Sequence, residues 1–321
     1  MMGAMPWVRG QYILVGGVVV VLLLLAFATA ACGTAPARTG VPNGPGDSGS
    51  AVDTAKLFPA SVNGRYGYID ASGRIVVQPQ FEGARDFSEG LAAVLLNGKW
   101  GFIGPSGKLV IVPEYSGKVF DFRDGLARIE VNGEVGYIDK TGHVALPTRF
   151  DQSAGEFGDG LAPLSRDGEY GYMDKSGSIA IRPQFGFAES FSGGLAAVEV
   201  NGLWGFVDTS GRFQILPKYR GELGFSDGLA GVCVNREWGY VDRKGHIVVS
   251  PSFDGVGSFG NGLAPVEKND VWGYISVDGS CVIAAKFSYA GDFHGGLALV
   301  RNEAGRYAYI NTQGAYVWVD S

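Results

Sequence analysis

The sequence predicts an all-β fold built from eight consecutive copies of one small antiparallel unit. Three observations support this prediction: a repeat of 34 or 35 residues, a high glycine content, and short apolar runs that alternate with polar residues. The 321-residue chain contains 52 glycines, more than twice the usual share of about 7%. These glycines follow no collagen period, so they indicate many tight turns between many short strands.

The repeat is clearest in a run of an aromatic residue, glycine, a second aromatic residue and an aliphatic residue, as in Trp100-Gly101-Phe102-Ile103. Its first position recurs at Tyr66, Trp100, Val135, Tyr170, Trp204, Trp238, Trp272 and Tyr307. A Gly-Leu pair such as Gly90-Leu91 opens every unit except the first. The units therefore begin near residues 57, 91, 126, 161, 195, 229, 263 and 297, and one repeat domain is predicted over 57–321.

Each unit is predicted to contain three strands. In the second unit these cover residues 91–97, 99–103 and 109–112, with glycine-bearing turns between them. Alternation with period 2 and turns of two to four residues is typical of an antiparallel meander. A proline such as Pro113 then ends the third strand, because proline donates no hydrogen bond to a ladder. The segments that follow are predicted exit loops: 82–86, 116–121, 151–156, 186–190, 220–224, 254–258 and 288–292.

The repeated unit resembles the WG-repeat family of bacterial proteins. The family signature is approximately G-L-A-x-V-x-x-N-G-K-W-G-Y-I-D-x-x-G-K-x-V-I-x-P-x-F, and the second unit matches it from Gly90-Leu91 through Trp100-Gly101 to Pro113. The resemblance implies an extracytoplasmic array of the β-propeller-like kind and no defined reaction. Three copies depart from the signature, with Gly104 in place of Asp, Val135 in place of Trp, and Ala284-Ala285 where proline is expected.

Eight such units either close into a propeller-like ring or stack as an open β-solenoid. A unit of 34 or 35 residues is shorter than a four-stranded blade of about 40–45 residues, which favours three-stranded blades or a solenoid. The last unit still carries an apolar strand, Val317-Trp318-Val319, with no charge or proline to protect an open edge. We therefore favour the ring and keep the solenoid as the alternative.

The first part of the chain is predicted to direct the repeat domain out of the cytoplasm. Tyr12 to Ala31 is uncharged and apolar, so residues 1–31 are predicted to be a signal peptide or membrane segment. Thr29-Ala30-Ala31-Cys32 resembles a bacterial lipobox, which implies lipidation of Cys32. Residues 32–56 are rich in Gly, Pro, Ser and Thr and are predicted to be a flexible tether. We expect a lipoprotein on the extracytoplasmic side of the cell membrane. A single N-terminal transmembrane anchor and simple secretion are the alternatives.

The repeated aromatic residues have two interpretations, a glycan-stacking platform or a structural frame. Trp100 and Phe102 lie two residues apart and so face the same side of a strand. Burying one such ring removes about 150–250 Å² from water. Because the rings recur at a fixed phase, we expect core roles for Trp100, Trp204, Trp238, Trp272, Tyr66, Tyr170 and Tyr307. The intervening glycine is expected to allow the close approach of another backbone.

Several patterns that suggest chemistry have a simpler explanation. An Asp followed by Gly three residues later, as in Asp70-x-x-Gly73, is typical of a turn in which the carboxylate caps backbone N–H groups. The same explanation covers Asp139, Asp174, Asp208 and Asp242, which we therefore do not expect to bind a metal. Gly255 to Gly260 formally matches G-x-G-x-x-G but precedes another strand, not a helix. We expect no metal, no cofactor and no enzymatic activity, because no acid, base or nucleophile breaks the symmetry of the repeat.

The positions of the cysteines bear on a possible disulfide, and the net charge bears on a possible nucleic-acid partner. Cys233 falls in a mostly polar, outward slot, whereas Cys281 aligns with Ile75, Leu109 and Ile247 in a slot expected to face inward. A disulfide between them is therefore not expected, and Cys281 is expected to pack as a small hydrophobe. The net charge of −6 and the lack of a Lys/Arg run argue against a nucleic-acid partner.

Function is expected in the exit loops, because they vary while the frame stays constant. Their charged and aromatic members make a candidate ligand-binding set of Arg85, Lys118, Phe120, Phe187, Arg220 and Tyr289. We hypothesise a membrane-anchored module that binds a protein, a peptide or a cell-envelope polymer. A structural spacer without a ligand is the second hypothesis, and a propeller-type hydrolase is the third.

Overall fold

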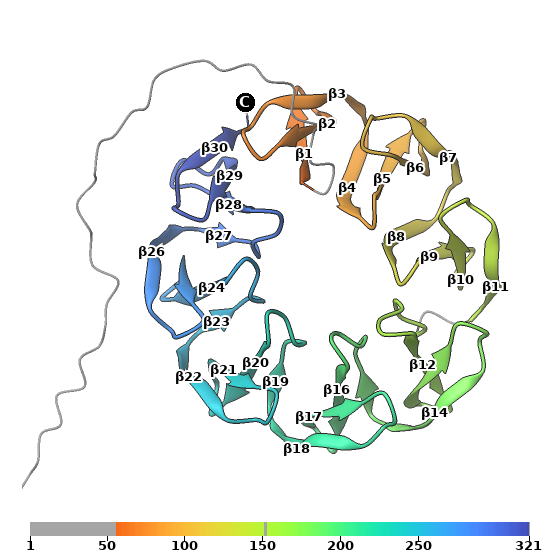
Figure 1. The fold of residues 1–321 in the computed structure, drawn as a ribbon, viewed down its shortest axis with the longest axis vertical. Helices are drawn as coiled ribbons and strands as arrows, with labels where there is room; N and C mark the ends of the chain where they lie inside the picture. Colours follow the sequence, from red (N-terminus) through yellow and green to blue (C-terminus); the bar gives the residue numbers. More distant parts are fainter. Residues whose placement is uncertain (1–55, 151–152, 321) are drawn as a thin grey trace, which may run out of the picture. The chain divides into compact units, whose positions relative to one another are not determined.

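The computed structural model describes residues 56–150 and 153–320, which form eight antiparallel sheets arranged as the blades of a ring (Figure 1). The strand order within every blade follows the sequence. Figure 1 shows β4, β8, β19, β23 and β27 toward the centre, and β7, β11, β18, β22 and β26 at the circumference. Among the described residues, no helix has the length and apolar character needed to cross a membrane.

The first four blades have the following strands. Blade 1 contains β1 (Leu57–Val62), β2 (Arg65–Asp70) and β3 (Ile75–Phe81). Blade 2 contains β4 (Gly83–Ser88), β5 (Leu91–Leu96), β6 (Lys99–Ile103) and β7 (Leu109–Tyr115). Blade 3 contains β8 (Lys118–Arg123), β9 (Leu126–Val131), β10 (Glu134–Asp139) and β11 (Val144–Phe150). Blade 4 contains β12 (Leu161–Arg166), β13 (Glu169–Asp174) and β14 (Ile179–Phe185).

The last four blades each have four strands. Blade 5 contains β15 (Phe187–Ala188), β16 (Leu195–Val200), β17 (Leu203–Asp208) and β18 (Phe213–Tyr219). Blade 6 contains β19 (Gly221–Glu222), β20 (Leu229–Val234), β21 (Glu237–Asp242) and β22 (Ile247–Phe253). Blade 7 contains β23 (Gly255–Val256), β24 (Leu263–Lys268), β25 (Val271–Ser276) and β26 (Cys281–Phe287). Blade 8 contains β27 (Tyr289–Ala290), β28 (Leu297–Arg301), β29 (Tyr307–Asn311) and β30 (Tyr316–Val319).

The structure confirms the all-β repeat and the ring, and it corrects the number of strands in a unit. Within the described ranges, six blades have a fourth, innermost strand, and it comes from a segment predicted to be an exit loop. Gly83 and Ala84 of β4, for example, pair with Leu95 and Val94 of β5. These inner strands are as short as two residues and form only by pairing with the next unit. Their own sequence therefore shows no alternation.

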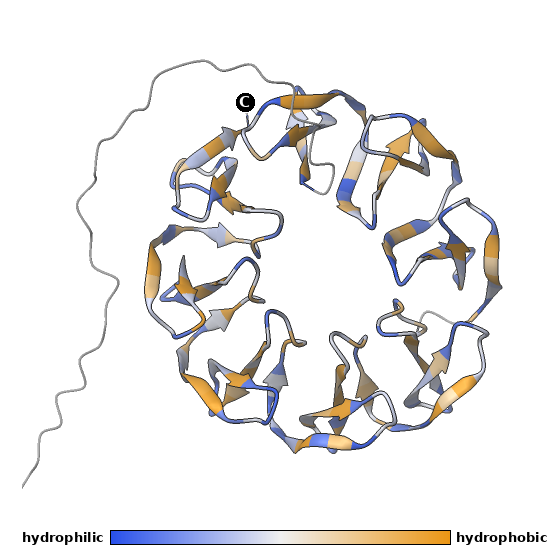
Figure 2. Cartoon of the chain, viewed as in Figure 1, coloured by the Kyte–Doolittle hydropathy of each residue, from blue (hydrophilic) through white to orange (hydrophobic). Residues whose placement is uncertain are grey.

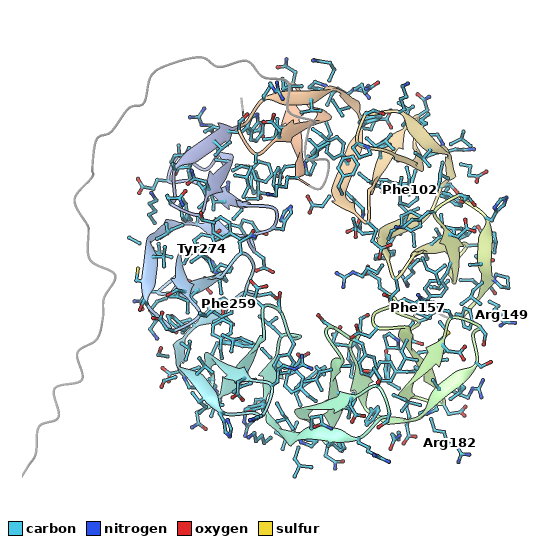
Figure 3. All side chains as sticks on the ribbon, in the orientation of Figure 1. Phe102, Arg149, Phe157, Arg182, Phe259 and Tyr274 are labelled. Carbon is cyan, nitrogen blue, oxygen red and sulfur yellow. The ribbon has the colours of Figure 1, made fainter. Side chains whose placement is uncertain are left out.

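Neighbouring blades are joined by pairs of aromatic rings. The second aromatic residue of each unit packs against a phenylalanine from the inner segment of the next blade, with ring centroids 4.6–4.9 Å apart. Tyr240 and Phe259 are one such pair, 4.7 Å apart and 1% exposed each. Figure 3 shows Phe102, Phe157, Phe259 and Tyr274 within the ring of blades, whereas Arg149 and Arg182 lie at its outer edge.

A hydrogen bond accompanies these ring pairs wherever the second aromatic residue is tyrosine. The hydroxyl groups of Tyr68, Tyr172 and Tyr240 donate to the backbone carbonyls of Arg85, Glu189 and Gly257, at 2.7–2.9 Å. Tyr137 and Tyr274 make the same bond to Gly155 and Gly291. Each joint with a tyrosine therefore combines an aromatic contact with a bond to a main-chain acceptor, whereas Phe102 and Phe206 have no hydroxyl group to donate.

The ring closes between blade 8 and blade 1 through the same kind of contact. Blade 1 has no inner strand among the described residues, but Phe58 occupies the slot that holds alanine in the other units, such as Ala92 and Ala127. The Phe58 ring lies 5.5 Å from that of Tyr309, whose hydroxyl donates to the carbonyl of Pro59 at 3.0 Å. Phe58 thus replaces the missing inner phenylalanine, so no strand has to be shared between the two ends of the ring.

The glycine between the two aromatic residues allows a bulge in the outer strand. A Cβ atom on Gly101 would lie 2.6 Å from the carbonyl oxygen of Ile111, so the expected close backbone approach is confirmed. Trp100 pairs with Tyr115 but Phe102 pairs with Ile111, which leaves two extra residues in β7. In the last unit, where Ala308 replaces the glycine, Ala308 and Tyr309 pair with the consecutive residues Val319 and Trp318. The bulge therefore depends on glycine.

The repeated aspartates cap the turns between the last two strands of a blade, as in the turn that begins at Asp139. Asp139 accepts hydrogen bonds from the backbone N–H groups of Thr141 and His143, which confirms the turn-capping prediction. The Thr141 hydroxyl and these N–H groups lower the pKa of Asp139.

The outer-strand slot that holds Cys281 is exposed to solvent. The equivalent residues Leu109 and Ile247 are 45% and 56% exposed, so the predicted inward packing of Cys281 is wrong. The outermost strands include many exposed apolar residues, such as Val112 and Leu216, and Figure 2 colours parts of these strands as hydrophobic. Cys233 is a free, partly buried thiol.

The inter-blade joint predicts the effect of a single truncation. Phe259→Ala should lower the free energy of unfolding by about 3–5 kcal/mol, because a fully buried ring leaves a cavity against Tyr240. Phe213→Ala is the matched control, since this ring is 37% exposed and its loss should cost about 1 kcal/mol or less. Denaturant unfolding followed by tryptophan fluorescence measures both, and equal losses would contradict the role of the joint.

Candidate binding site in the central channel

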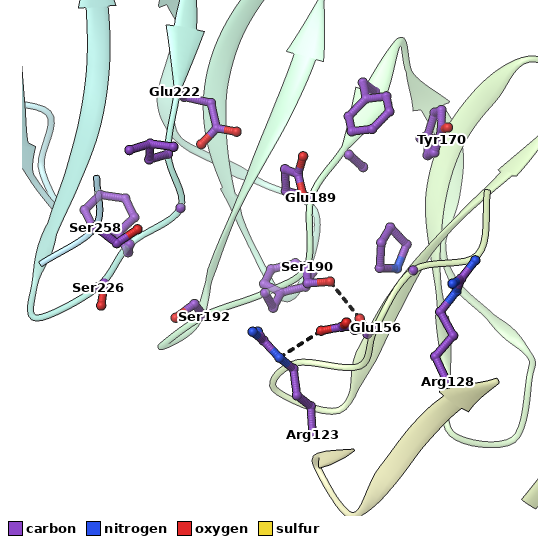
Figure 4. Close-up of a pocket in the computed structure, with 18 of the residues that line it drawn as sticks. Arg123, Arg128, Glu156, Tyr170, Glu189, Ser190, Ser192, Glu222, Ser226 and Ser258 are labelled. Atoms are coloured by element: carbon purple, nitrogen blue, oxygen red, sulfur yellow. Dashed lines mark hydrogen bonds and ion pairs between the residues drawn. The ribbon is translucent and has the colours of Figure 1, made fainter. Parts of the chain in front are cut away.

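The wall of the central channel contains a cavity of about 920 Å³. Blades 3 to 6 supply most of its lining, through side chains within residues 120–128, 153–170, 187–192 and 222–226. Ser258 of blade 7 and Asp292 of blade 8 complete the lining. The cavity therefore occupies one side of an otherwise repetitive ring, where the inner segments of neighbouring blades meet (Figure 4).

The six predicted ligand-binding residues do not form one site. Phe120 and Phe187 line the cavity, and Arg85 lies beside it with its guanidinium 5.3 Å from the centre of the Phe120 ring. The remaining three lie outside the cavity lining: Lys118 is exposed and pairs with Glu130 at 3.8 Å, Arg220 is exposed, and Tyr289 is 46% exposed. Of the six predicted residues, two therefore line the cavity and a third lies at its edge.

Arg128 breaks the repeat symmetry at the edge of the cavity. Its slot holds Ala93, Pro163, Ala197, Gly231, Pro265 or Leu299 in the other units. The side chain is only 8% exposed, its Nε donates to the carbonyl of Ala154 at 2.7 Å, and its guanidinium lies 4.4 Å from the centre of the Phe120 ring. A buried cation is stabilised by such contacts.

Glu222 breaks the symmetry more strongly, because it places a carboxyl group in an apolar slot. The equivalent residues are Ala84, Val119, Ala154, Ala188, Val256 and Ala290. The Oε2 atom of Glu222 is buried and has no hydrogen-bond partner. Burial, with a smaller contribution from the nearby charge of Glu189, raises the pKa of Glu222 to about 8. The group is therefore mostly protonated at neutral pH.

A second group of charges lies on the lower wall in Figure 4. The Arg123 Nε and Glu156 Oε2 atoms are 2.9 Å apart, and the Ser190 hydroxyl donates to the Glu156 carbonyl at 2.7 Å. Burial raises the pKa of Glu156, and the neighbouring Arg123 partly opposes this rise. Burial also raises the pKa of Glu189. The wall thus combines a compensated ion pair with two carboxyl groups, Glu189 and Glu222, that have no cationic partner among the described interactions.

The expectation that no acid breaks the repeat symmetry is therefore wrong. The repeat pattern does not identify Arg128 and Glu222, because it is defined by the residues that the units share. The signal that marks them is a charged residue in a slot that otherwise holds alanine, valine, leucine, proline or glycine. Within residues 56–150 and 153–320, no group of three or more His, Cys, Asp or Glu side chains is arranged to hold a metal ion.

The repeated aromatic residues lie at the edge of the blade cores. Trp100, Trp272 and Tyr66 are partly buried and pack against the clusters between blades, as do Tyr170 and Trp204. Trp238 is also partly buried. Tyr307 is 47% exposed, so its predicted core role is wrong; its unit lacks the glycine and the bulge that shape this site elsewhere. The predicted lipidation site Cys32, the signal segment 1–31 and residues 32–55 of the tether lie outside the described residues.

Comparison with known families and structures places the fold. The family model described as WG containing repeat matches residues 66–100, 100–134, 136–170, 170–204, 204–237, 238–272 and 272–305. BamB from Moraxella catarrhalis is similar in structure, with a TM-score of 0.50 and 13% identity over 81% of this chain and 97% of that one. A eukaryotic initiation factor gives a TM-score of 0.51 and 11% identity, over 83% and 96% of the two chains.

A third similar structure is the dihydro-heme d1 dehydrogenase NirN in complex with DHE. It gives a TM-score of 0.56 and 13% identity over 86% of this chain and 75% of that one. At such identities these similarities concern the fold alone. The comparison with curated proteins gives no match.

The unusual environment of Glu222 predicts a pH-dependent gain of stability in Glu222→Val. The wild-type fold holds a proton that the unfolded carboxyl group releases above its ordinary pKa of 4.5, so the wild type should lose stability as pH rises from 4.5 to about 8. Glu222→Val should therefore be more stable by about 1–3 kcal/mol at pH 8, and by less at pH 5. Denaturant unfolding at pH 5, 6.5 and 8 measures the difference.

The exposed Glu169→Gln serves as the matched control for Glu222→Val and should show no such trend. A difference between Glu222→Val and wild type that stays constant across these pH values would contradict the proposed burial of the Glu222 carboxyl group.

Proposed function

The chain belongs to the family of WG containing repeat proteins, and we propose that it acts as a non-catalytic interaction module whose channel wall binds a protein, a peptide or a cell-envelope polymer. The observation that carries this proposal is the contrast between the frame and the wall. The joints repeat from blade to blade, whereas several side chains around the cavity do not: one slot holds Phe120, Glu189 and Leu223 in blades 3, 5 and 6. Variable segments on a rigid frame are the usual location of binding residues.

The chemistry of the wall supports binding over a purely structural role. Arg128 is a buried charged residue and Glu222 has one buried carboxyl oxygen, and both stand in slots that the other units fill with small or apolar residues. Such groups cost stability relative to apolar residues of similar size. A spacer gains nothing from that cost, whereas a binding site gains polar groups beside the exposed face of Phe187, which is 39% exposed. We assign no reaction, cofactor or nucleic-acid partner to the chain.

Exchange of wall segments tests the proposal. Residues 186–190 and 220–224 would be replaced by the equivalent residues 288–292 and 254–258 in the full-length, detergent-solubilised chain. Partners captured from envelope extract, and glycans bound on an array, should fall at least tenfold. Exchange of the outer turn 175–178 for 209–212 is the matched control and should leave capture unchanged. Equal capture by both variants would contradict a role for the wall.

The N-terminal sequence supports a second proposal, anchoring to the extracytoplasmic side of the cell membrane through lipid on Cys32. The support is the apolar stretch from Tyr12 to Ala31 and the lipobox-like Thr29-Ala30-Ala31-Cys32. Labelled palmitate should be incorporated by the wild type and lost in Cys32→Ala. Unchanged labelling in that variant would contradict lipidation, and unlabelled protein that stays in the membrane fraction would favour the transmembrane anchor.

A further inference from the structure

The upper part of the cavity joins two carboxyl groups to an apolar surface. Glu189 follows β15 and Glu222 ends β19, so the two side chains come from neighbouring blades and both line the cavity. Figure 4 shows both carboxyl groups turned into the cavity. Their proximity is also expressed in the pKa of Glu222, which the charge of Glu189 raises further.

One carboxyl oxygen of Glu222 is buried without a hydrogen-bond partner. The Oε2 atom is shielded from solvent and has no hydrogen-bond partner, whereas the buried guanidinium of Arg128 has a carbonyl acceptor and an aromatic face. Leaving a buried polar atom without a hydrogen-bond partner lowers stability. A ligand that brings a compact donor to this oxygen recovers that cost on binding.

The surroundings of the carboxyl groups suit an alkyl stem beside the donor. Phe187 exposes 39% of its surface, and its ring lies 4.7 Å from that of Tyr170. Leu223 and Ala188 also line the cavity. Two blades away from Phe187, Phe120 already lies within 5.3 Å of two guanidinium groups, so aromatic faces in this wall accept cations.

We propose that the region between Glu189 and Glu222 binds the primary ammonium group of a lysine side chain carried by a partner peptide. The proposal rests on the proposed function and names the chemistry of its ligand. An ammonium group is a compact charge with three donors on a four-carbon stem, which fits one buried acceptor beside an apolar wall. A guanidinium group is a poorer match, because its planar fork requires a pair of aligned acceptors. The net charge of −6 also favours the approach of a basic segment.

Binding of an ammonium group must ionise Glu222. The groups that face it are Glu189 and the Tyr172 hydroxyl, whose pKa burial raises. Glu156, Arg123 and Arg128 line the same cavity but interact with each other or with main-chain acceptors. Affinity for the ammonium group should therefore rise between pH 6 and pH 9, where lysine keeps its charge.

Calorimetry on the full-length chain in detergent tests the proposal with acetyl-Gly-Gly-Lys-Gly-Gly-amide as the probe. The matched norleucine peptide should bind at least tenfold more weakly than the lysine peptide at pH 8. Glu222→Val should weaken lysine-peptide binding at least tenfold and abolish its dependence on pH. Because valine occupies this slot in blades 3 and 7, the variant is expected to fold, and Glu169→Gln should behave as the wild type.

Three results would overturn the proposal: no binding of the lysine peptide at millimolar concentration, equal affinity for the norleucine peptide, or unchanged affinity in Glu222→Val. Tighter binding of a glucosamine oligomer than of the lysine peptide would overturn the assignment to a peptide. None of these results affects the segment-exchange experiment, so a failure of this inference is distinct from a failure of the proposed function.

Discussion

The fold depends on one contact, the aromatic pair between each blade and the next. A tyrosine or phenylalanine on the third strand of a four-stranded blade packs against a phenylalanine delivered by the following inner segment. Because the partner always comes from the next unit, no blade completes its own core, and each needs a neighbouring segment to cover it. Phe58 meets this requirement at the junction of blades 8 and 1, where it packs on Tyr309 in place of an inner-strand phenylalanine. Among the described residues, closure therefore rests on a cluster around Phe58 that includes Ile69 and Leu297, and blade 1 has no inner strand.

The same joint explains why the channel wall is free to vary. The tyrosine hydroxyl bonds to a backbone carbonyl, and the residues that supply this carbonyl include Arg85, Gly155, Glu189 and Gly257. A main-chain acceptor is present whatever the side chain, so the joint does not restrict residue type at this slot. The side chains of the same slot include Phe120, Glu189 and Leu223, all of which line the cavity. The constraint that holds the blades together thus leaves the chemistry of the wall unconstrained.

The repeat in the sequence was enough to predict most of the strands, but not the innermost strands of the four-stranded blades. The period, the glycines and the alternation predicted the strands that start at Leu91 or Leu126, because these strands are apolar on one face along their own length. β15 and β19 have two residues each and exist only through pairing with the next unit, so no local pattern announces them. The site was partly predictable for a related reason. Phe120 and Phe187 are variable aromatic residues and were identified, whereas Arg128 and Glu222 appear only when one slot is read across all units.

Arg128 and Glu222 show two different outcomes of placing a polar group in a slot designed for a small or apolar residue. Arg128 is compensated within the fold, because Ala154 supplies an acceptor and Phe120 supplies a ring face. That arrangement rigidifies the wall and needs nothing from outside. Glu222 has one buried oxygen without a hydrogen-bond partner, and the nearest charge, Glu189, repels its ionised form. The fold therefore stabilises the charge of Arg128 by itself, whereas the ionised carboxyl group of Glu222 would be stabilised by an external cation. Glu222, not the more deeply buried Arg128, therefore marks the position in the wall where a ligand would add the most stabilisation.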